Sequence, residues 1–187
     1  MNKNKSSTET VKKALSETTR AISKKSDLNV NFESETYKHD QTNVQLSRIS
    51  IKKTKNEILN ARGESDAQAL FIRYHDKKID QKYAPQGDIA LNLFNEMEQA
   101  RCEAIGGIIY PGAAKNIENN VEKKSKKFFE NSEPNKKFPL QDSLTLLIKK
   151  KASNLKLSEN SEKGLKMWED FILNESKSNF IKIIESI

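Results

Sequence analysis

The stretch TKNEILNARGESDAQALFIRYHDKK, residues 54–78, decides the fold, because it predicts one long helix. Thr54 and Glu57 have the spacing of a capping box, so we place the helix at about 55–78. Gly63 costs about 1 kcal/mol relative to alanine inside a helix, and it therefore indicates tight packing at that point. The apolar positions that follow the helical period are Ile58, Leu59, Ala67, Leu70, Phe71 and Tyr74.

Upstream of this helix the pattern changes twice. Residues 1–5 are predicted to be a flexible tail, and the capping-box spacing of Ser6 and Glu9 predicts a helix that ends near Lys25. Residues 28–32 then alternate apolar and polar side chains, and residues 44–46 do the same after a polar connection at 33–42, which is typical of strands. We predict a small two-stranded sheet there, built on Leu28, Val30, Phe32, Val44 and Leu46.

Downstream, the periodicity predicts only helices. One is expected at 88–105, capped by Asp88 and ended by Gly106 and Gly107. A Pro111–Gly112 turn and a charged helix over 113–130 follow. We expect residues 131–137 to be a linker inside one mainly α domain over 6–187. Three shorter helices are expected after it, at 139–151, 159–173 and 177–187; the chain ends within the last, so we expect a piece of a longer protein.

The composition limits the classes of function. The net charge is +7, but 28 of the 33 basic residues are lysine and acids interleave with them, which argues against nucleic-acid binding as the role. Cys102 is the one cysteine and is expected to be a small buried residue. No apolar stretch is long enough to predict a membrane span, and the N-terminus is polar; both fit a cytoplasmic protein.

The usual catalytic and metal motifs are missing or incomplete. Gly107 and Gly112 have the spacing of a phosphate-binding loop, but Ala113 and Ala114 stand where lysine and serine or threonine are needed. His75–Asp76 resembles a phosphohydrolase dyad, yet two histidines are too few for its other ligands. We favour His75 as a helix C-terminal residue stabilised by the helix dipole. The sequence thus predicts no catalytic, cofactor-binding or metal-ligating residue.

Polar residues on the two helices at 55–78 and 88–105 allow two interpretations. Glu98 and Arg101 are three apart, as are Arg73 and Asp76, while Asp66 and Arg73 share a face. Solvated pairs of this kind are worth a few tenths of a kcal/mol each. The alternative is a polar network between two packed helices. Spacing alone favours the solvated pairs.

Three runs in this region carry a resemblance to a known family. Residues 62–76, RGESDAQALFIRYHD, resemble the RGxxDAxALxxRxHD run of CobT proteins, and an Ala-Pro element follows at 83–87. Residues 94–106, FNEMEQARCEAIG, resemble their LEQARxEAxG signature, and residues 112–117 their GxxxNL element. The signature positions are Arg62, Gly63, Asp66, Arg73, His75, Asp76, Glu98, Gln99, Arg101, Glu103 and Gly106.

The resemblance implies a role in cobalamin biosynthesis. CobT proteins assemble with an AAA+ ATPase, CobS, and a large subunit, CobN, into the cobaltochelatase that inserts cobalt into hydrogenobyrinic acid a,c-diamide. The complex is expected to use ATP, Mg and cobalt, with the ATP site in CobS and cobalt insertion in CobN. This chain would then be a non-catalytic assembly subunit. The acidic linker and von Willebrand A domain of a full CobT are absent from these residues.

Two other classes stay open at this point: a basic helical module that binds nucleic acid or protein without any part in chelation, and a small hydrolase with an unrecognised site. For the helices at 55–78 and 88–105, the resemblance favours the polar network over solvated pairs. We predict that these two helices pack antiparallel, with Asp66 and Arg73 contacting Glu98 or Arg101.

Overall fold

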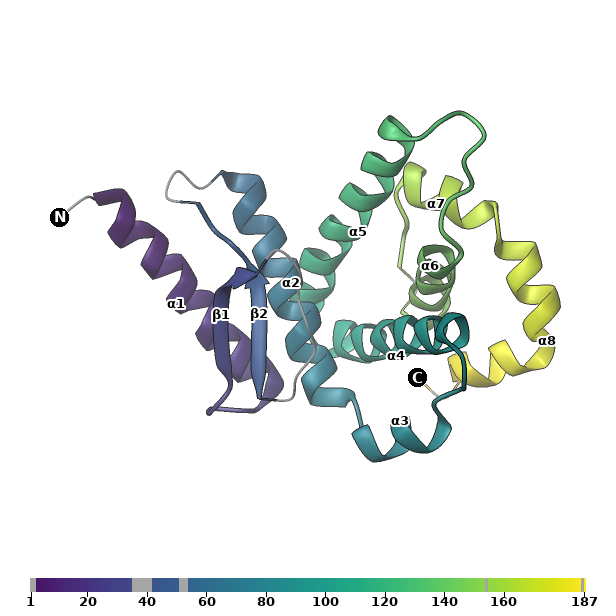
Figure 1. The fold of residues 1–187 in the computed structure, drawn as a ribbon, viewed down its shortest axis with the longest axis horizontal. Helices are drawn as coiled ribbons and strands as arrows, with labels where there is room; N and C mark the ends of the chain where they lie inside the picture. The colour runs from purple at the N-terminus through teal and green to yellow at the C-terminus, as the bar shows by residue number, and fades with distance from the viewer. Residues whose placement is uncertain (1–2, 35–41, 51–53, 154, 186) are drawn as a thin grey trace. The chain divides into compact units, whose positions relative to one another are not determined.

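The fold is mainly helical with one small sheet, as predicted (Figure 1). The computed structural model describes residues 3–34, 42–50, 54–153, 155–185 and 187. These residues form two compact units. The first holds the chain up to Tyr74 together with Tyr110–Asn120, and the second holds His75–Ile109 and the chain from Val121 onward. The prediction of a single domain over 6–187 stays a prediction.

The first unit contains α1 (Lys3–Ser23), β1 (Asn29–Ser34), β2 (Asn43–Ser47), α2 (Lys55–Tyr74) and the beginning of α5 (Pro111–Asn131). The two strands pair in parallel, with Asn29 opposite Asn43. The sheet packs on both α1 and α2, which is the support that so small a sheet needs. The core is apolar and consists of Leu15, Leu28, Phe32, Val44, Leu46, Ile49, Ala61 and Ile72.

The second unit contains α3 (Lys77–Tyr83), α4 (Asp88–Ile109), the rest of α5, α6 (Leu140–Ala152), α7 (Glu159–Lys166) and α8 (Glu169–Glu185). Helix α6 is the central element, since α4, α7 and α8 all pack against it. The last three helices supply most of the buried core of this unit. Its buried members are Ala100, Phe138, Leu146, Leu147, Ile148, Leu157, Leu165, Ile172 and Phe180.

The capping box predicted at residue 54 is confirmed, whereas the one at residue 6 is wrong. The backbone N–H of Thr54 donates to Glu57 Oε2 at 2.6 Å, and the N–H of Glu57 donates to Thr54 Oγ1 at 3.2 Å. Helix α1, by contrast, already begins at Lys3, so the predicted tail is helical from that residue and Ser6 is not its first cap. The run Ser6–Glu9 is rich in capping residues, so the spacing recurs there without marking a start.

The helix predicted at 55–78 is two helices. Helix α2 ends at Tyr74, and Asp76 is the N-cap of α3. The Asp76 side chain accepts hydrogen bonds from the backbone N–H groups of Lys78 at 2.8 Å and Ile79 at 3.2 Å. Aspartate at an N-cap satisfies donors that a new helix leaves open, which favours a restart over continuation.

Three further predicted boundaries are wrong. Helix α4 continues through both glycines to Ile109, and Pro111 is the first residue of α5, where its fixed φ suits a helix start. The helix predicted at 159–173 ends at Lys166 instead. Helix α8 begins at Glu169 and is kinked at Lys177, whose φ of 48° is left-handed.

The predicted apolar stripes are only partly buried. Ile89 follows the helical period of the apolar residues in the helix predicted at 88–105, yet it is 80% exposed. Helix α2 buries polar and small residues beside its apolar ones, including Ser65 and Gln68. Its partner in the first unit is α1, while the partner of α4 in the second unit is α6. The antiparallel packing predicted for α2 and α4 joins elements of different units, and it stays a prediction.

Candidate functional site

The signature residues form separate polar clusters in the two units. Arg62, Gly63, Asp66 and Arg73 lie on α2 in the first unit. The second unit holds His75, Asp76, Glu98, Gln99, Arg101, Glu103 and Gly106. Contacts between Asp66 or Arg73 and Glu98 or Arg101 would join residues of different units, and they stay a prediction.

Asp66 and Gly63 lie where α2 meets the first turns of α5. Asn116 Nδ2 donates to Asp66 Oδ2 at 2.8 Å, and Asn120 Nδ2 donates to the carbonyl oxygen of Asn60 at 3.0 Å. Asp66 is only 5% exposed. Burial raises the pKa of its carboxyl, although the Asn116 hydrogen bond and the charge of Arg62 oppose the shift. A Cβ at Gly63 would come within 2.6 Å of the Asn116 backbone oxygen, so the two helices approach as closely as glycine permits.

Arg73 joins the ends of three segments of the first unit. Its Nη1 donates to the carbonyl oxygen of Ile22, near the C-terminus of α1, at 2.9 Å. The guanidinium carbon lies 5.4 Å from the ring centroids of both Tyr74 and Tyr110. A planar cation can stack on aromatic rings while its edge donates a hydrogen bond. Arg73 therefore connects the C-terminal ends of α1 and α2 with the residue that precedes α5.

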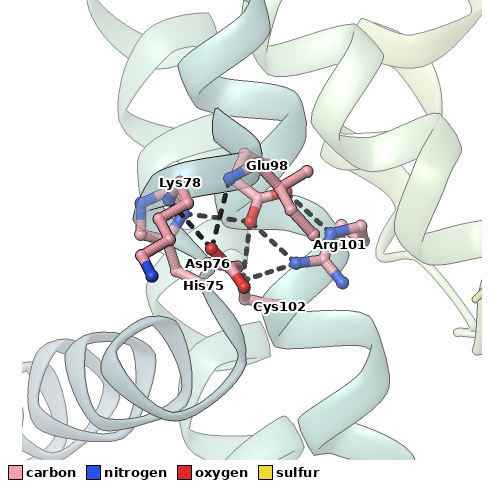
Figure 2. A network of polar contacts seen from close by, with 7 residues as sticks. His75, Asp76, Lys78, Glu98, Arg101 and Cys102 are labelled. Atoms are coloured by element: carbon pink, nitrogen blue, oxygen red, sulfur yellow. Dashed lines mark hydrogen bonds and ion pairs between the residues drawn. The ribbon is translucent and has the colours of Figure 1, made fainter. Parts of the chain in front are cut away.

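Glu98 is the centre of the polar network in the second unit (Figure 2). Arg101 donates to both carboxylate oxygens, from Nε to Oε2 and from Nη2 to Oε1, each at 2.7 Å. His75 Nδ1 lies 3.1 Å from Glu98 Oε1. The side chains of Glu98 and His75 are 16% and 10% exposed, and that of Arg101 is 32% exposed. The pair at spacing three is thus a partly buried network, not an ordinary solvated pair.

The network ties the start of the second unit to α4. His75 directly follows α2, so its predicted place at the C-terminus of a helix is close to the observed one. Its ring, however, is bonded to Glu98. Asp76, drawn beside it in Figure 2, caps α3. Backbone hydrogen bonds from Ile79 and Lys78 lower the pKa of the Asp76 carboxyl.

Cys102 is fully buried beside this network, as predicted. Its Sγ lies 3.6 Å from Glu98 Oε1. Burial raises the pKa of the thiol far above its usual range, and the nearby carboxylate of Glu98 adds to the effect. A nucleophilic or redox-active cysteine needs the opposite environment, one that stabilises the thiolate. Cys102 is therefore a packing residue.

A buried ion pair connects α4 to α6, and the sequence patterns did not predict it. Lys149 Nζ contacts Glu103 Oε2, and the two side chains are 7% and 8% exposed. Gln99 Nε2 donates to the other carboxylate oxygen of Glu103 at 2.6 Å. Gly106 is buried on the same helix. Lys149 is one of three lysines in the last turn of α6, and no sequence signal separates it from the other two.

Glu98 and Asp66 are predicted to respond to pH in opposite directions. Burial alone would raise the pKa of Glu98, but the hydrogen bonds from Arg101 and His75 outweigh it and lower that pKa. Its contribution to stability is therefore present above pH 4.5 and lost as the pH falls through the lowered folded value. Asp66 has a raised pKa, so its contribution is full below pH 3.8 and lost as the pH rises through the raised folded value.

Carboxyl-carbon NMR titration of the native chain, with Glu98→Gln and Asp66→Asn to assign the two signals, tests both directions. Glu98 should titrate below pH 4.5, and Asp66 above pH 3.8. A titration of Glu98 at or above pH 4.5 would contradict the network.

The interactions described above link elements within each unit. Within residues 3–34, 42–50, 54–153 and 155–185, no group of three or more His, Cys, Asp or Glu side chains is arranged to hold a metal ion. Over the same part of the chain, no helix has the length and apolarity needed to cross a membrane. The signature side chains hold helices together: α2 to α1 and α5 in the first unit, and α4 to α6 and residue 75 in the second.

These features define a helical protein in which several signature residues connect neighbouring elements of the same unit. A family model described as cobalamin biosynthesis protein CobT matches residues 5–186. The match covers nearly the whole chain, so the chain belongs to the CobT family and takes part in cobalamin biosynthesis. No solved structure matches the fold.

Proposed function

We propose that this chain is a non-catalytic, partner-binding subunit of the cobaltochelatase that inserts cobalt into hydrogenobyrinic acid a,c-diamide. Membership of the CobT family over residues 5–186 carries the proposal, since the resemblance implies assembly with an AAA+ ATPase of the CobS type and a large subunit of the CobN type. ATP and Mg would be used by the ATPase, and cobalt is the substrate of the complex. The complex would work in the cytoplasm.

The roles of the signature residues support an assembly function. Asp66, Arg73 and Glu98 each bond to a side chain or backbone group within the same unit. Side chains used in this way are committed to shaping the fold. Their internal hydrogen bonds account for these three side chains without a role in turnover.

Affinity capture tests the proposal directly. The tagged chain is mixed with purified ATPase and large subunit, with and without ATP and Mg, and the eluate is analysed for both. We expect at least one subunit to be retained, because assembly is the role that the family implies. A heat-unfolded sample of the same chain is the control for non-specific capture. Retention of neither subunit by a folded chain, with both partners shown to be folded, would contradict the proposal.

A further inference from the structure

The second unit carries an apolar surface around the junction of α7 and α8. Met167 is 38% exposed and Phe171 is 50% exposed. Between them in sequence, the ring of Trp168 meets that of Phe171 edge-on, with centroids 5.7 Å apart. Exposed large apolar side chains that lie together mark interaction sites more often than scattered single ones do.

Trp168 and Met167 both contact the backbone of buried Phe138. Trp168 Nε1 donates to the carbonyl oxygen of Phe138 at 2.6 Å, and the backbone N–H of Phe138 lies 3.4 Å from Met167 Sδ. Phe138 itself is buried, with its ring stacked on that of Phe129 at 5.7 Å. A Cβ at Gly164 would lie 2.7 Å from the Phe138 ring, so the packing there is tight. The rings are thus presented on a rigid base, which lowers the entropy cost of binding.

Two lysines lie over rings of this cluster, one over Trp168 and one over Phe129. Lys137 Nζ lies 5.0 Å from the centroid of Trp168, and Lys163 Nζ lies 4.4 Å from that of Phe129. Lys136 and Lys166 are exposed nearby in sequence. None of the four makes an ion pair with any residue that the structure describes, whereas Lys124, Lys126, Lys149 and Lys150 of the same unit do.

We propose that this basic aromatic surface, formed by Lys136, Lys137, Lys163, Lys166, Met167 and Phe171, binds an acidic segment of a partner protein through spaced carboxylates and an apolar side chain. The inference rests on the proposed function and names the chemistry of one partner contact. Positive charge around the rings complements carboxylates, and the rings accept the apolar side chain.

Charge details favour an acidic protein segment over a nucleic acid. Glu169 and Asp170 directly follow Trp168 in the sequence, and their negative charges oppose the dense, continuous charge of a phosphate backbone more than that of a few spaced carboxylates. The surface also lacks arginine, because all five arginines of the chain lie between residues 20 and 101. Arginine is the side chain most suited to phosphate and base recognition.

Trp168 makes the test direct, because it is the only tryptophan of the chain. The probe is a synthetic peptide in which glutamates alternate with leucine and phenylalanine, titrated into the full chain while tryptophan emission is recorded. A matched peptide with glutamine for glutamate and a single-stranded DNA oligonucleotide are titrated in parallel. We expect the acidic peptide to change the emission saturably and to bind more weakly as salt rises.

Two double variants locate the effect. Lys137→Gln with Lys163→Gln should weaken binding of the acidic peptide by about tenfold, as expected when two rim charges are lost. Lys123→Gln with Lys126→Gln removes the same charge from α5 and should leave the affinity within about twofold. No saturable change with the acidic peptide, equal binding of the glutamine peptide, equal loss in both variants, or tighter binding of the DNA would each overturn the proposal. The chelatase subunits are absent from this assay, so its failure is distinguishable from failure of the capture experiment.

Discussion

Replacing Lys149 by methionine is expected to lower the free energy of unfolding by about 3–5 kcal/mol, the cost typical of a broken buried ion pair. Glu103 would keep its buried charge and lose its cationic partner, since both side chains are less than a tenth exposed. Gln99 would still donate to one oxygen, but a neutral amide does not replace an ammonium group. Denaturant unfolding followed by circular dichroism measures the loss.

Lys150 provides a matched control on the same helix. It pairs with Glu162, but the two side chains are 30% and 32% exposed, so water solvates them when the pair is broken. Lys150→Met should cost less than about 1 kcal/mol. The double variant Glu103→Met, Lys149→Met should recover most of the loss, because it removes both buried charges. Equal losses for Lys149→Met and Lys150→Met would show that the Glu103 pair is not buried in solution.

Replacing Gly63 by alanine is expected to destabilise the first unit by about 1–3 kcal/mol, the usual range for overpacking. Helix propensity alone predicts a gain of about 1 kcal/mol, so the sign of the change decides between the two effects. The added Cβ would lie 2.4 Å from Asn120 Nδ2 and 2.6 Å from the Asn116 backbone oxygen. The Asn120 side chain can turn away, but it would then leave the Asn60 carbonyl oxygen. The Asn116 backbone can move only with α5.

Gly112→Ala is the control for this prediction. Gly112 is the second residue of α5, and a Cβ there meets nothing within 4 Å. This variant should be neutral or stabilise the chain by up to about 1 kcal/mol. Melting temperatures of the two variants, measured beside the parent chain, give the comparison. A stability gain in Gly63→Ala equal to that in Gly112→Ala would contradict the close approach of α2 and α5.

The elements that could be predicted from sequence are those with a local signal. The alternation of Val44 and Leu46 gave the second strand, and both side chains are fully buried. The capping-box spacing of Thr54 and Glu57 predicted the start of α2, and their reciprocal hydrogen bonds confirm it. Parallel pairing of the strands had no local signal, because alternation is the same in either direction.

The burial of α2 shows why the rest could not be predicted. Apolar periodicity locates one buried face, but α2 also buries polar side chains that are satisfied by distant partners. Ser65 Oγ lies 2.6 Å from Thr19 Oγ1, 46 positions away in the sequence. Glu64 accepts hydrogen bonds from the backbone N–H and hydroxyl of Ser47, at 2.9 and 2.7 Å. Such pairings depend on tertiary contact, so a single sequence read by period assigns these residues to solvent.

In the candidate clusters, too, the local pair could be predicted from sequence and the tertiary contacts could not. Glu98 and Arg101 were paired from their spacing, and the pair is confirmed. Their partial burial and the contact with His75 depend on α2 ending at Tyr74, whereas the predicted helix continued past His75. Lys149 was missed because an inward lysine looks the same as a solvated one in a helix with three lysines in its last turn.

The central claim, that this chain contributes assembly and not turnover, is tested most directly by cobalt insertion in a reconstituted system. The ATPase and the large subunit are supplied with ATP, Mg, cobalt and hydrogenobyrinic acid a,c-diamide, with the chain added or omitted. We predict that insertion depends on the chain, and that the chain alone neither hydrolyses ATP nor inserts cobalt. Insertion that is equally fast when the chain is omitted, or turnover by the chain on its own, would contradict the claim.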